Sequence, residues 1–161
     1  MLRPLVPREL RLSADFLSHL ETIAAEAVAY ADRARAAVRP RVSTGGKLDR
    51  AALDREQHIV HGLAWVATYA ETLREVRDWA RTLNEQGKFG ETEHLLAKLL
   101  ASEYAAQLSG GVAMSQVETV RPGDFGVEAP RAALDVTQQE KTRLAELLRE
   151  GRGRATLENT G

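Results

Sequence analysis

The sequence contains no cysteine, few aromatic residues and no long apolar run. Without cysteine the chain forms neither disulfides nor thiolate metal sites, and a reducing cytoplasm is its expected location. No apolar run approaches the roughly 20 residues that a membrane-spanning helix needs. The N-terminal residues lack the apolar core and the cleavage site of a signal peptide. We therefore expect a cytoplasmic protein that has no membrane partner.

An excess of charge of one sign is also missing. The sequence holds 22 basic and 23 acidic side chains, for a formal net charge of −1, and the two signs are mixed along the chain. A protein that binds nucleic acid usually carries a basic face, and none stands out here. We therefore expect no nucleic-acid partner. Arginine greatly outnumbers lysine and alanine is abundant, which is typical of a bacterium with a GC-rich genome.

The residues that are present predict helices. The chain has 161 residues, of which 43% are hydrophobic and 28% charged, as in an ordinary single globular domain. Apolar residues recur at steps of three and four, and no strand pattern is evident. The first predicted helix begins at an N-cap residue, Ser13, and ends before Pro40, so residues 1–12 are expected to be irregular. Residues 43–46 predict a turn.

The second predicted helix is the longest and runs from Leu48 to Gln86, with Asp49 as its N-cap. Trp65, Tyr69 and Trp79 widen its apolar stripe, which indicates contact with more than one neighbouring element. Gly62 lies inside this helix, where glycine costs up to about 1 kcal/mol relative to alanine. We interpret it as a place where another helix approaches closely.

Two further helices complete the predicted bundle. The third begins near Gly90 or Glu91 and ends at Gly110, and the last begins at a capping box that starts with Thr137. Residues 115–118 also fit a capping box and predict a short helical turn, while residues 122–136 look irregular. The expected fold is all-α: an antiparallel bundle of about four helices around one long central helix. The bundle domain is expected at residues 13–150, with a disordered tail at 151–161.

Searches for catalytic and metal-binding patterns give no complete site. A di-iron bundle needs two Glu-x-x-His motifs, and Glu91 with His94 is the one match. His58 and His61 share a helix face, but two ligands do not make a metal site. Residues 43–47 depart from the phosphate-binding loop, and no nucleophile elbow is present. We predict no catalytic, cofactor or metal residue in this chain. A stand-alone helical bundle that serves as an interaction module or as a metal- or ligand-binding module is the alternative.

Several short motifs share their order and spacing with a known family. They comprise His61-Gly62-Leu63-Ala64-Trp65-Val66-Ala67-Thr68-Tyr69, then Glu71, Leu73, Arg74, Trp79-Ala80, Gly87-Lys88-Phe89-Gly90-Glu91, Glu103-Tyr104 and Gly110-Gly111-Val112-Ala113-Met114-Ser115-Gln116. Over roughly residues 40–125 the chain resembles the N-terminal helical extension of the (2S)-methylsuccinyl-CoA dehydrogenases. These enzymes are flavin-dependent members of the acyl-CoA dehydrogenase family.

The resemblance implies a role without catalysis for this chain. In the family, FAD accepts hydride from the β-carbon while a glutamate removes the α-proton, and methylsuccinyl-CoA becomes mesaconyl-CoA in the ethylmalonyl-CoA pathway. Both groups lie in the main body of the enzyme, which no segment of this chain matches. The chain is therefore expected to be an accessory domain that docks on that body or takes part in oligomerisation. The candidate docking residues are His61, Trp65, Tyr69, Trp79 and Phe89.

One flavin-linked motif of the family is incomplete here. Helical domains of acyl-CoA dehydrogenases often carry Arg-x-x-Phe-Gly, in which the arginine lies near the flavin diphosphate. Phe89 and Gly90 match the end of this motif, but Gln86 stands at the arginine position. We therefore expect no flavin contact from this chain, and FAD is expected only in the enzyme body.

Overall fold

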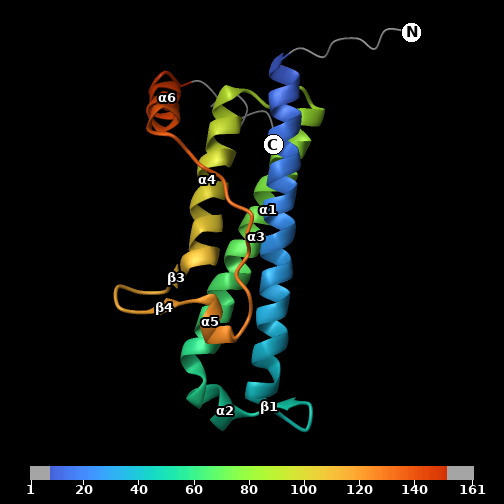
Figure 1. Cartoon of the computed structure of the whole chain (residues 1–161), viewed down its shortest axis with the longest axis vertical. Coiled ribbons are helices and arrows are strands. Elements are labelled where there is room, and N and C mark those ends of the chain that lie inside the picture. Colours follow the sequence, from blue (N-terminus) through green and yellow to red (C-terminus); the bar gives the residue numbers. More distant parts are fainter. Residues whose placement is uncertain (1–7, 152–161) are drawn as a thin grey trace, which may run out of the picture.

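Three long antiparallel helices form the body of the molecule (Figure 1). They are α1 (Arg8–Val38), α3 (Gln57–Glu85) and α4 (Glu91–Gly110). The computed structural model describes residues 8–151, and side chains from residue 14 onward. Within that range no helix is long and apolar enough to cross a membrane. The predicted all-α bundle is confirmed.

The first helix begins earlier than the sequence pattern indicated. Residues 8–12 are already helical, so the prediction of an irregular segment there is wrong, and Ser13 lies inside α1 instead of capping it. Glu9, Leu10 and Arg11 are good helix formers, which explains why the helix extends upstream of the apolar stripe. The rest of the predicted irregular segment, residues 1–7, lies outside the described residues.

The predicted long helix from Leu48 to Gln86 is interrupted at Glu56. A short helix, α2 (Arg50–Arg55), precedes the break, and α3 begins directly after it. Glu56 has φ −97° and ψ 18°, which departs from helical geometry, and its carboxylate pairs with the guanidinium of Arg41. The prediction of one continuous helix is therefore wrong, and α1, with 31 residues, is longer than α3, with 29.

A tight hairpin connects α1 to α2. After α1 comes a 3₁₀ turn, η1 (Arg39–Val42), and then the two-residue strands β1 (Ser43–Thr44) and β2 (Lys47–Leu48) pair antiparallel. Gly45 and Gly46 join these strands with φ of 59° and 79°, the left-handed region that glycine adopts without strain. The predicted end of the first helix before Pro40 and the predicted turn are both confirmed. Asp49 caps α2 by accepting the N–H of Ala52 at 3.0 Å, as predicted.

A second hairpin follows α4, where a helical turn was predicted. Strands β3 (Val112–Ala113) and β4 (Thr119–Val120) pair antiparallel. The hydroxyl of Ser115 accepts the N–H of Glu118 at 3.1 Å, as in a capping box, but the chain reverses direction there. The helical prediction for residues 115–118 is therefore wrong. A one-turn helix, α5 (Pro122–Phe125), begins the segment predicted to be irregular, since proline suits the first position of a helix.

The last helix lies across the outer side of α4. An extended segment, residues 126–137, runs back along the bundle to α6 (Gln138–Arg149), as Figure 1 shows. The predicted capping box is confirmed: the N–H of Glu140 donates to Thr137 Oγ1 at 3.2 Å, and the N–H of Thr137 donates to the Glu140 carboxylate at 2.9 Å. Leu144 and Leu147 bury against Leu95 of α4. The predicted disordered tail falls, apart from Gly151, outside the described residues.

Small residues let the central elements approach closely. Along α1 the buried positions include Ala24, Ala27, Ala31 and Ala34. In α3, a Cβ atom added to Gly62 would lie 2.6 Å from the nearest Val120 side-chain carbon. Close approach at Gly62 was predicted correctly, but the neighbour is strand β4 and not a helix.

Candidate interaction site

Three of the five predicted docking residues, His61, Trp65 and Tyr69, lie in a row on α3. Together with Tyr104 of α4 they form a cluster that we call the aromatic ladder. His61 Nε2 accepts the indole N–H of Trp65 at 3.0 Å. Trp65 meets Tyr69 edge to face at 6.1 Å between ring centroids, and Tyr69 stacks on Tyr104 at 4.4 Å with 8° between the rings. The ladder therefore joins α3 to α4 through ring contacts.

The other two predicted docking residues, Trp79 and Phe89, belong to a separate cluster near the start of α4. We call this cluster the aromatic cap. It contains Phe16, Trp79, Phe89 and His94. Phe16 stacks on His94 at 4.3 Å, and Phe89 lies 6.5 Å from Trp79 and 6.2 Å from His94. The cap ties α1, α3, α4 and the loop before α4 together, so Phe89 packs inward.

The structure does not bring the five predicted residues into one site. Trp65 and Trp79 are 14 residues apart on α3, which at 1.5 Å per residue is about 21 Å. The metal hypothesis meets the same obstacle, because His61 lies in the ladder and His94 in the cap. Among residues 8–151, no group of three or more histidines and carboxylates is arranged to hold a metal ion.

Burial changes the ionisation of both clusters. It raises the pKa of the Tyr69 hydroxyl, and the neighbouring Tyr104 raises this pKa further. The Tyr69 hydroxyl lies 3.1 Å from Gln107 Oε1, to which it donates a hydrogen bond. In the cap, burial first and the positive charge of Lys98 second lower the pKa of the His94 imidazole. Burial therefore favours the neutral form of both groups.

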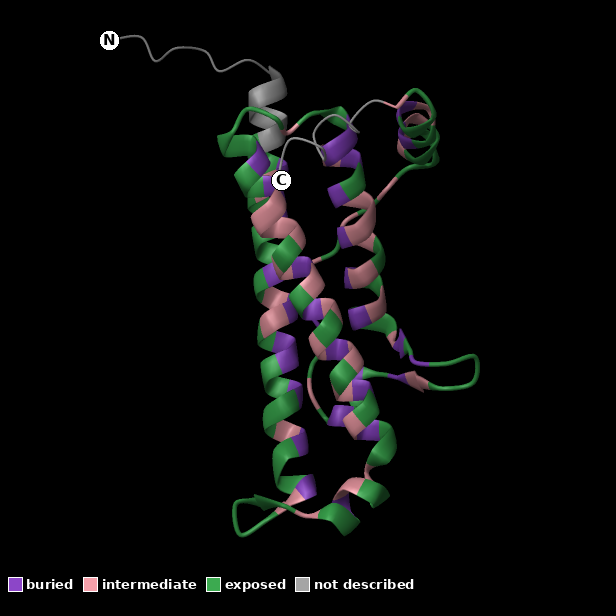
Figure 2. Cartoon of the chain, turned by 180° about the vertical axis from the view of Figure 1, so that it is seen from behind, coloured by how far each residue is buried: buried purple, intermediate pink, exposed green. Residues whose placement is uncertain are grey.

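The ladder and Trp79 lie where α3 meets α4 and the loop before α4. On these two helices Trp65, Tyr69, Val76 and Trp79 of α3 and Leu100 and Tyr104 of α4 are half-buried and pack against the main core. Leu96 of α4 is 37% exposed. Figure 2, which views the molecule from behind, shows buried and half-buried residues where the two helices face each other.

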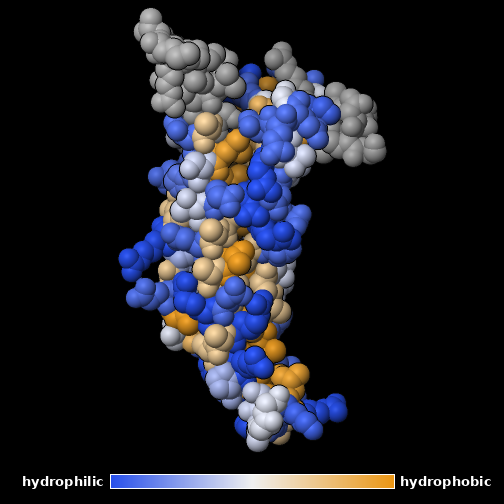
Figure 3. All heavy atoms as spheres, turned by 90° about the vertical axis from the view of Figure 1, so that its right-hand side faces the viewer, coloured by the Kyte–Doolittle hydropathy of each residue, from blue (hydrophilic) through white to orange (hydrophobic). Residues whose placement is uncertain are grey.

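Ion pairs cross two of the other helix boundaries. Arg77 of α3 pairs with Glu21 of α1 at 2.9 Å. Between α4 and α6, Lys98 pairs with Glu140 at 2.5 Å and Arg143 with Glu91 at 2.9 Å. Figure 3 shows the side on which α1 lies, where hydrophilic side chains interrupt the apolar patches. The α3–α4 boundary differs, because its cross-helix contacts are the Tyr69–Tyr104 stack and the bond to Gln107.

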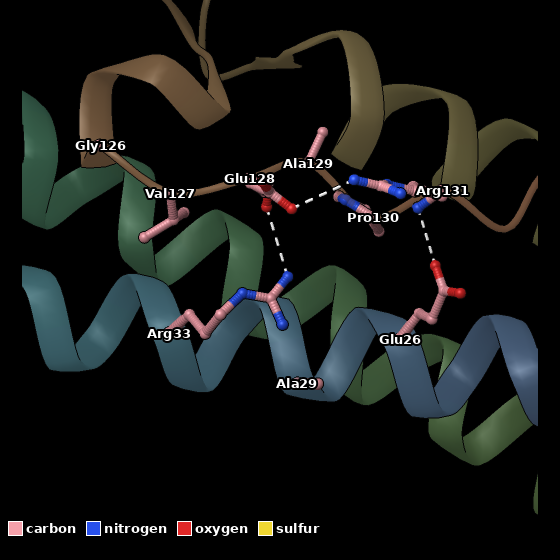
Figure 4. A pocket seen from close by; sticks show the side chains of 9 residues that line it. All are labelled: Glu26, Ala29, Arg33, Gly126, Val127, Glu128, Ala129, Pro130 and Arg131. Carbon is pink, nitrogen blue, oxygen red and sulfur yellow. Dashed lines mark hydrogen bonds and ion pairs between the residues drawn. The ribbon is translucent and has the colours of Figure 1, made fainter.

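A hollow lies between α1 and the extended segment after α5 (Figure 4). Its volume is about 530 Å³. The Glu26 carboxylate accepts the N–H groups of Arg131 at 2.7 Å and Ala132 at 2.8 Å, which hold its pKa below the ordinary value. Arg33 donates to the Glu128 carbonyl at 3.3 Å. These charged groups fasten the segment to α1.

Sequence reasoning missed the α4 residues that meet the aromatic ladder, Tyr104 and Gln107. Tyr104 and Leu100 were assigned to the buried stripe of the third helix, and Leu96 was treated in the same way. One signal was available: Leu96, Leu100, Tyr104 and Gln107 follow one another at steps of three and four on one face, beside a stripe already occupied by the core. Their pairing with α3 depends on tertiary contacts.

The fold defines an all-α helical-bundle domain, and residues 8–151 show no recognisable catalytic cluster. No protein-family model matches the chain. It is 40% identical over 167 aligned positions to (2S)-methylsuccinyl-CoA dehydrogenase from Cereibacter sphaeroides, and the alignment covers 99% of this chain. It covers 29% of that protein, so the relationship is at the level of a domain. The resemblance predicted from the sequence is confirmed.

Proposed function

We propose that the chain is a non-catalytic helical domain of a flavin-dependent acyl-CoA dehydrogenase, and that it acts by docking on the catalytic body of that enzyme. One observation carries the proposal: nearly the whole chain aligns with a part of the Cereibacter sphaeroides enzyme, while most of that enzyme lies outside the alignment. The reaction proposed for the whole enzyme is the oxidation of methylsuccinyl-CoA to mesaconyl-CoA.

In this proposal FAD is bound by the catalytic body. The described residues of this chain do not fit a flavin site at the position that the family motif indicates. Gln86 is exposed at the place of the motif arginine, and it offers an amide where a diphosphate calls for a cation. Phe89 packs against Trp79 and His94.

The surface of the bundle supports docking. Trp65, Tyr69 and Trp79 of α3 stay half-exposed. Aromatic side chains in such positions commonly supply much of the binding free energy of an interface. These residues are therefore our candidates for contact with a protein partner.

A binding experiment tests the proposal. The matching segment is deleted from the Cereibacter sphaeroides enzyme, and the flavin-loaded remainder is titrated with this chain by isothermal calorimetry. We expect saturable one-to-one binding with a Kd of about 10 μM or tighter. A flavin dehydrogenase of similar size without a matching segment is the control. If the remainder shows no binding and is as active as the intact enzyme, the proposal is wrong.

A further inference from the structure

Helix α6 is joined to the bundle through a short hinge. The extended segment before it is fixed to the body, because Glu26 of α1 accepts two of its backbone N–H groups and Leu134 packs against the main core. The next described residue that belongs to a hydrophobic cluster is Leu144, inside α6. Residues 135–137, between these two anchors, have no regular secondary structure. The chain can therefore turn at 135–137 without disturbing the main core.

The apolar contact between α6 and α4 is small. Leu144 and Leu147 of α6 are buried against Leu95 of α4, Leu99 is partly buried beside them, and this cluster is separate from the main core. A hollow of about 600 Å³, lined by polar side chains of both helices, lies at the same boundary. A helix of 12 residues is marginally stable when it stands alone. The position of α6 therefore depends on further contacts with α4.

Those further contacts are ion pairs. Three of them cross from α4 to α6: Lys98–Glu140 at 2.5 Å, Glu91–Arg143 at 2.9 Å and Glu103–Lys141 at 3.9 Å. Arg143 binds the Glu91 carboxylate through two N–H groups. The side chains of the second and third pairs are between 37% and 57% exposed. Salt screens exposed pairs, so the attachment of α6 is expected to weaken as the ionic strength rises.

We propose that α6 is a latch that opens about residues 135–137 while α1, α3 and α4 stay folded, and that the three ion pairs hold it closed. In the closed state the latch covers Leu95 and Leu99 of α4. Opening uncovers these two side chains, so charge at the α4–α6 boundary controls access to them. This inference goes beyond the proposed function and does not depend on it.

Distance measurements on the whole chain test the latch. Because the sequence has no cysteine, Thr82→Cys on α3 and Ala145→Cys on α6 can carry two spin labels, both at exposed positions. Double electron–electron resonance then gives the distribution of distances between α6 and the body. In about 0.1 M NaCl we expect one main distance. In about 1 M NaCl the screening length falls to about 3 Å, and we expect a longer distance that is at least about threefold more populated than in the low-salt sample.

Two substitutions remove charge from the boundary and leave its leucines in place. Lys98→Met and Arg143→Met, combined in one labelled chain, delete the cations of the two shortest pairs and keep long side chains at both positions. We expect the longer distance to reach its high-salt population already in the low-salt buffer. Arg35→Met is the control, because its ion pair with Asp32 lies within α1, and it should leave the distances unchanged. Circular dichroism confirms that each variant is folded.

Three results would overturn the inference. A single, unchanged distance in every sample would show that α6 is fixed on α4. A longer distance that appears only when the bundle loses its helical circular dichroism would show that α6 does not move separately. A longer distance that neither salt nor the combined Lys98→Met and Arg143→Met substitutions increase would show that the leucines, and not the ion pairs, hold the latch. None of these measurements involves the dehydrogenase body, so each of these results leaves the proposed function standing.

Discussion

Gly62 shows how a single residue sets the distance between two elements. It lies inside α3, where alanine is the better helix former, yet the space for a methyl group is filled by the side chain of Val120. The glycine thus lets strand β4 rest directly on the helix. Its presence is explained by packing and not by helix propensity.

We predict that Gly62→Ala destabilises the protein by about 1–3 kcal/mol, because overpacking against β4 outweighs the gain in helix propensity. Urea unfolding followed by circular dichroism measures the change. Val120→Ala removes the atoms that clash, so the double variant is expected to recover part of the loss. Strictly additive effects of the two substitutions would contradict this account of the contact.

His94 couples the aromatic cap to pH. Its pKa is lowered by burial and by Lys98, so the unfolded chain takes up the proton before the folded chain does. We predict that stability is full above the ordinary histidine pKa of about 6.5 and falls as pH drops below it. His94→Phe keeps a ring against Phe16, and it should make the urea midpoint nearly independent of pH between about pH 5 and 7. His58→Gln, at an exposed position, should leave the pH dependence in place. If the urea midpoint changes equally with pH in the unsubstituted protein and in both variants, His94 is not the source of the pH dependence.

At the scale of elements, α6 depends on local capping and a small contact area. Thr137 and Glu140 satisfy each other's backbone N–H groups, and Leu144 and Leu147 form a cluster with Leu95 that is separate from the main core. A helix of 12 residues gains little stability by itself. Its attachment therefore rests on these contacts and on the ion pairs with α4.

We predict that Thr137→Ala weakens α6 by about 1 kcal/mol. Hydrogen exchange should show faster exchange of the α6 amides, with those of α1 and α3 unchanged. Thr142→Ala is the control, because the Thr142 hydroxyl bonds within the helix to the Gln138 carbonyl and caps nothing. Uniformly faster exchange across all helices would mean that α6 is not a separate unit.

The boundaries of elements were predictable where the signal is local. Glu91, Gly110 and Thr137 mark helix ends through first-turn acids, glycine and a capping box, and each prediction was confirmed. The break at Glu56 was not predictable, because its partner Arg41 is brought in by the preceding hairpin. The 112–120 hairpin was missed because two-residue strands leave no periodic pattern.

The candidate site was predictable only in part, for the same reason. Trp65, Tyr69 and Trp79 were singled out as residues that widen the stripe of one helix, and each is half-buried in the structure. Their division between two clusters depends on Tyr104, Phe16 and His94, which reach them through tertiary packing. The sequence pattern identifies a helix face, and the structure identifies what that face meets.

At the scale of the whole molecule, charged contacts tie the outer elements to the bundle. Arg77 of α3 pairs with Glu21 of α1, Arg143 of α6 pairs with Glu91 of α4, and Glu26 holds the extended segment on α1. Trp65, Tyr69 and Trp79 of α3 stay half-exposed. In the proposed function the enzyme body would cover them, and a face that a larger enzyme covers need not be polar.

A replacement experiment in the relative tests whether this chain works as a domain of a dehydrogenase. The matching segment of the Cereibacter sphaeroides enzyme is exchanged for this chain, and oxidation of methylsuccinyl-CoA is compared with that of the intact enzyme and of an enzyme lacking the segment. We predict that the exchanged enzyme is active. Deletion of the segment is expected to lower kcat/KM, or to shorten the half-life of the flavin-loaded enzyme, by at least about tenfold. A deletion enzyme that is as active and as stable as the intact one would contradict the account.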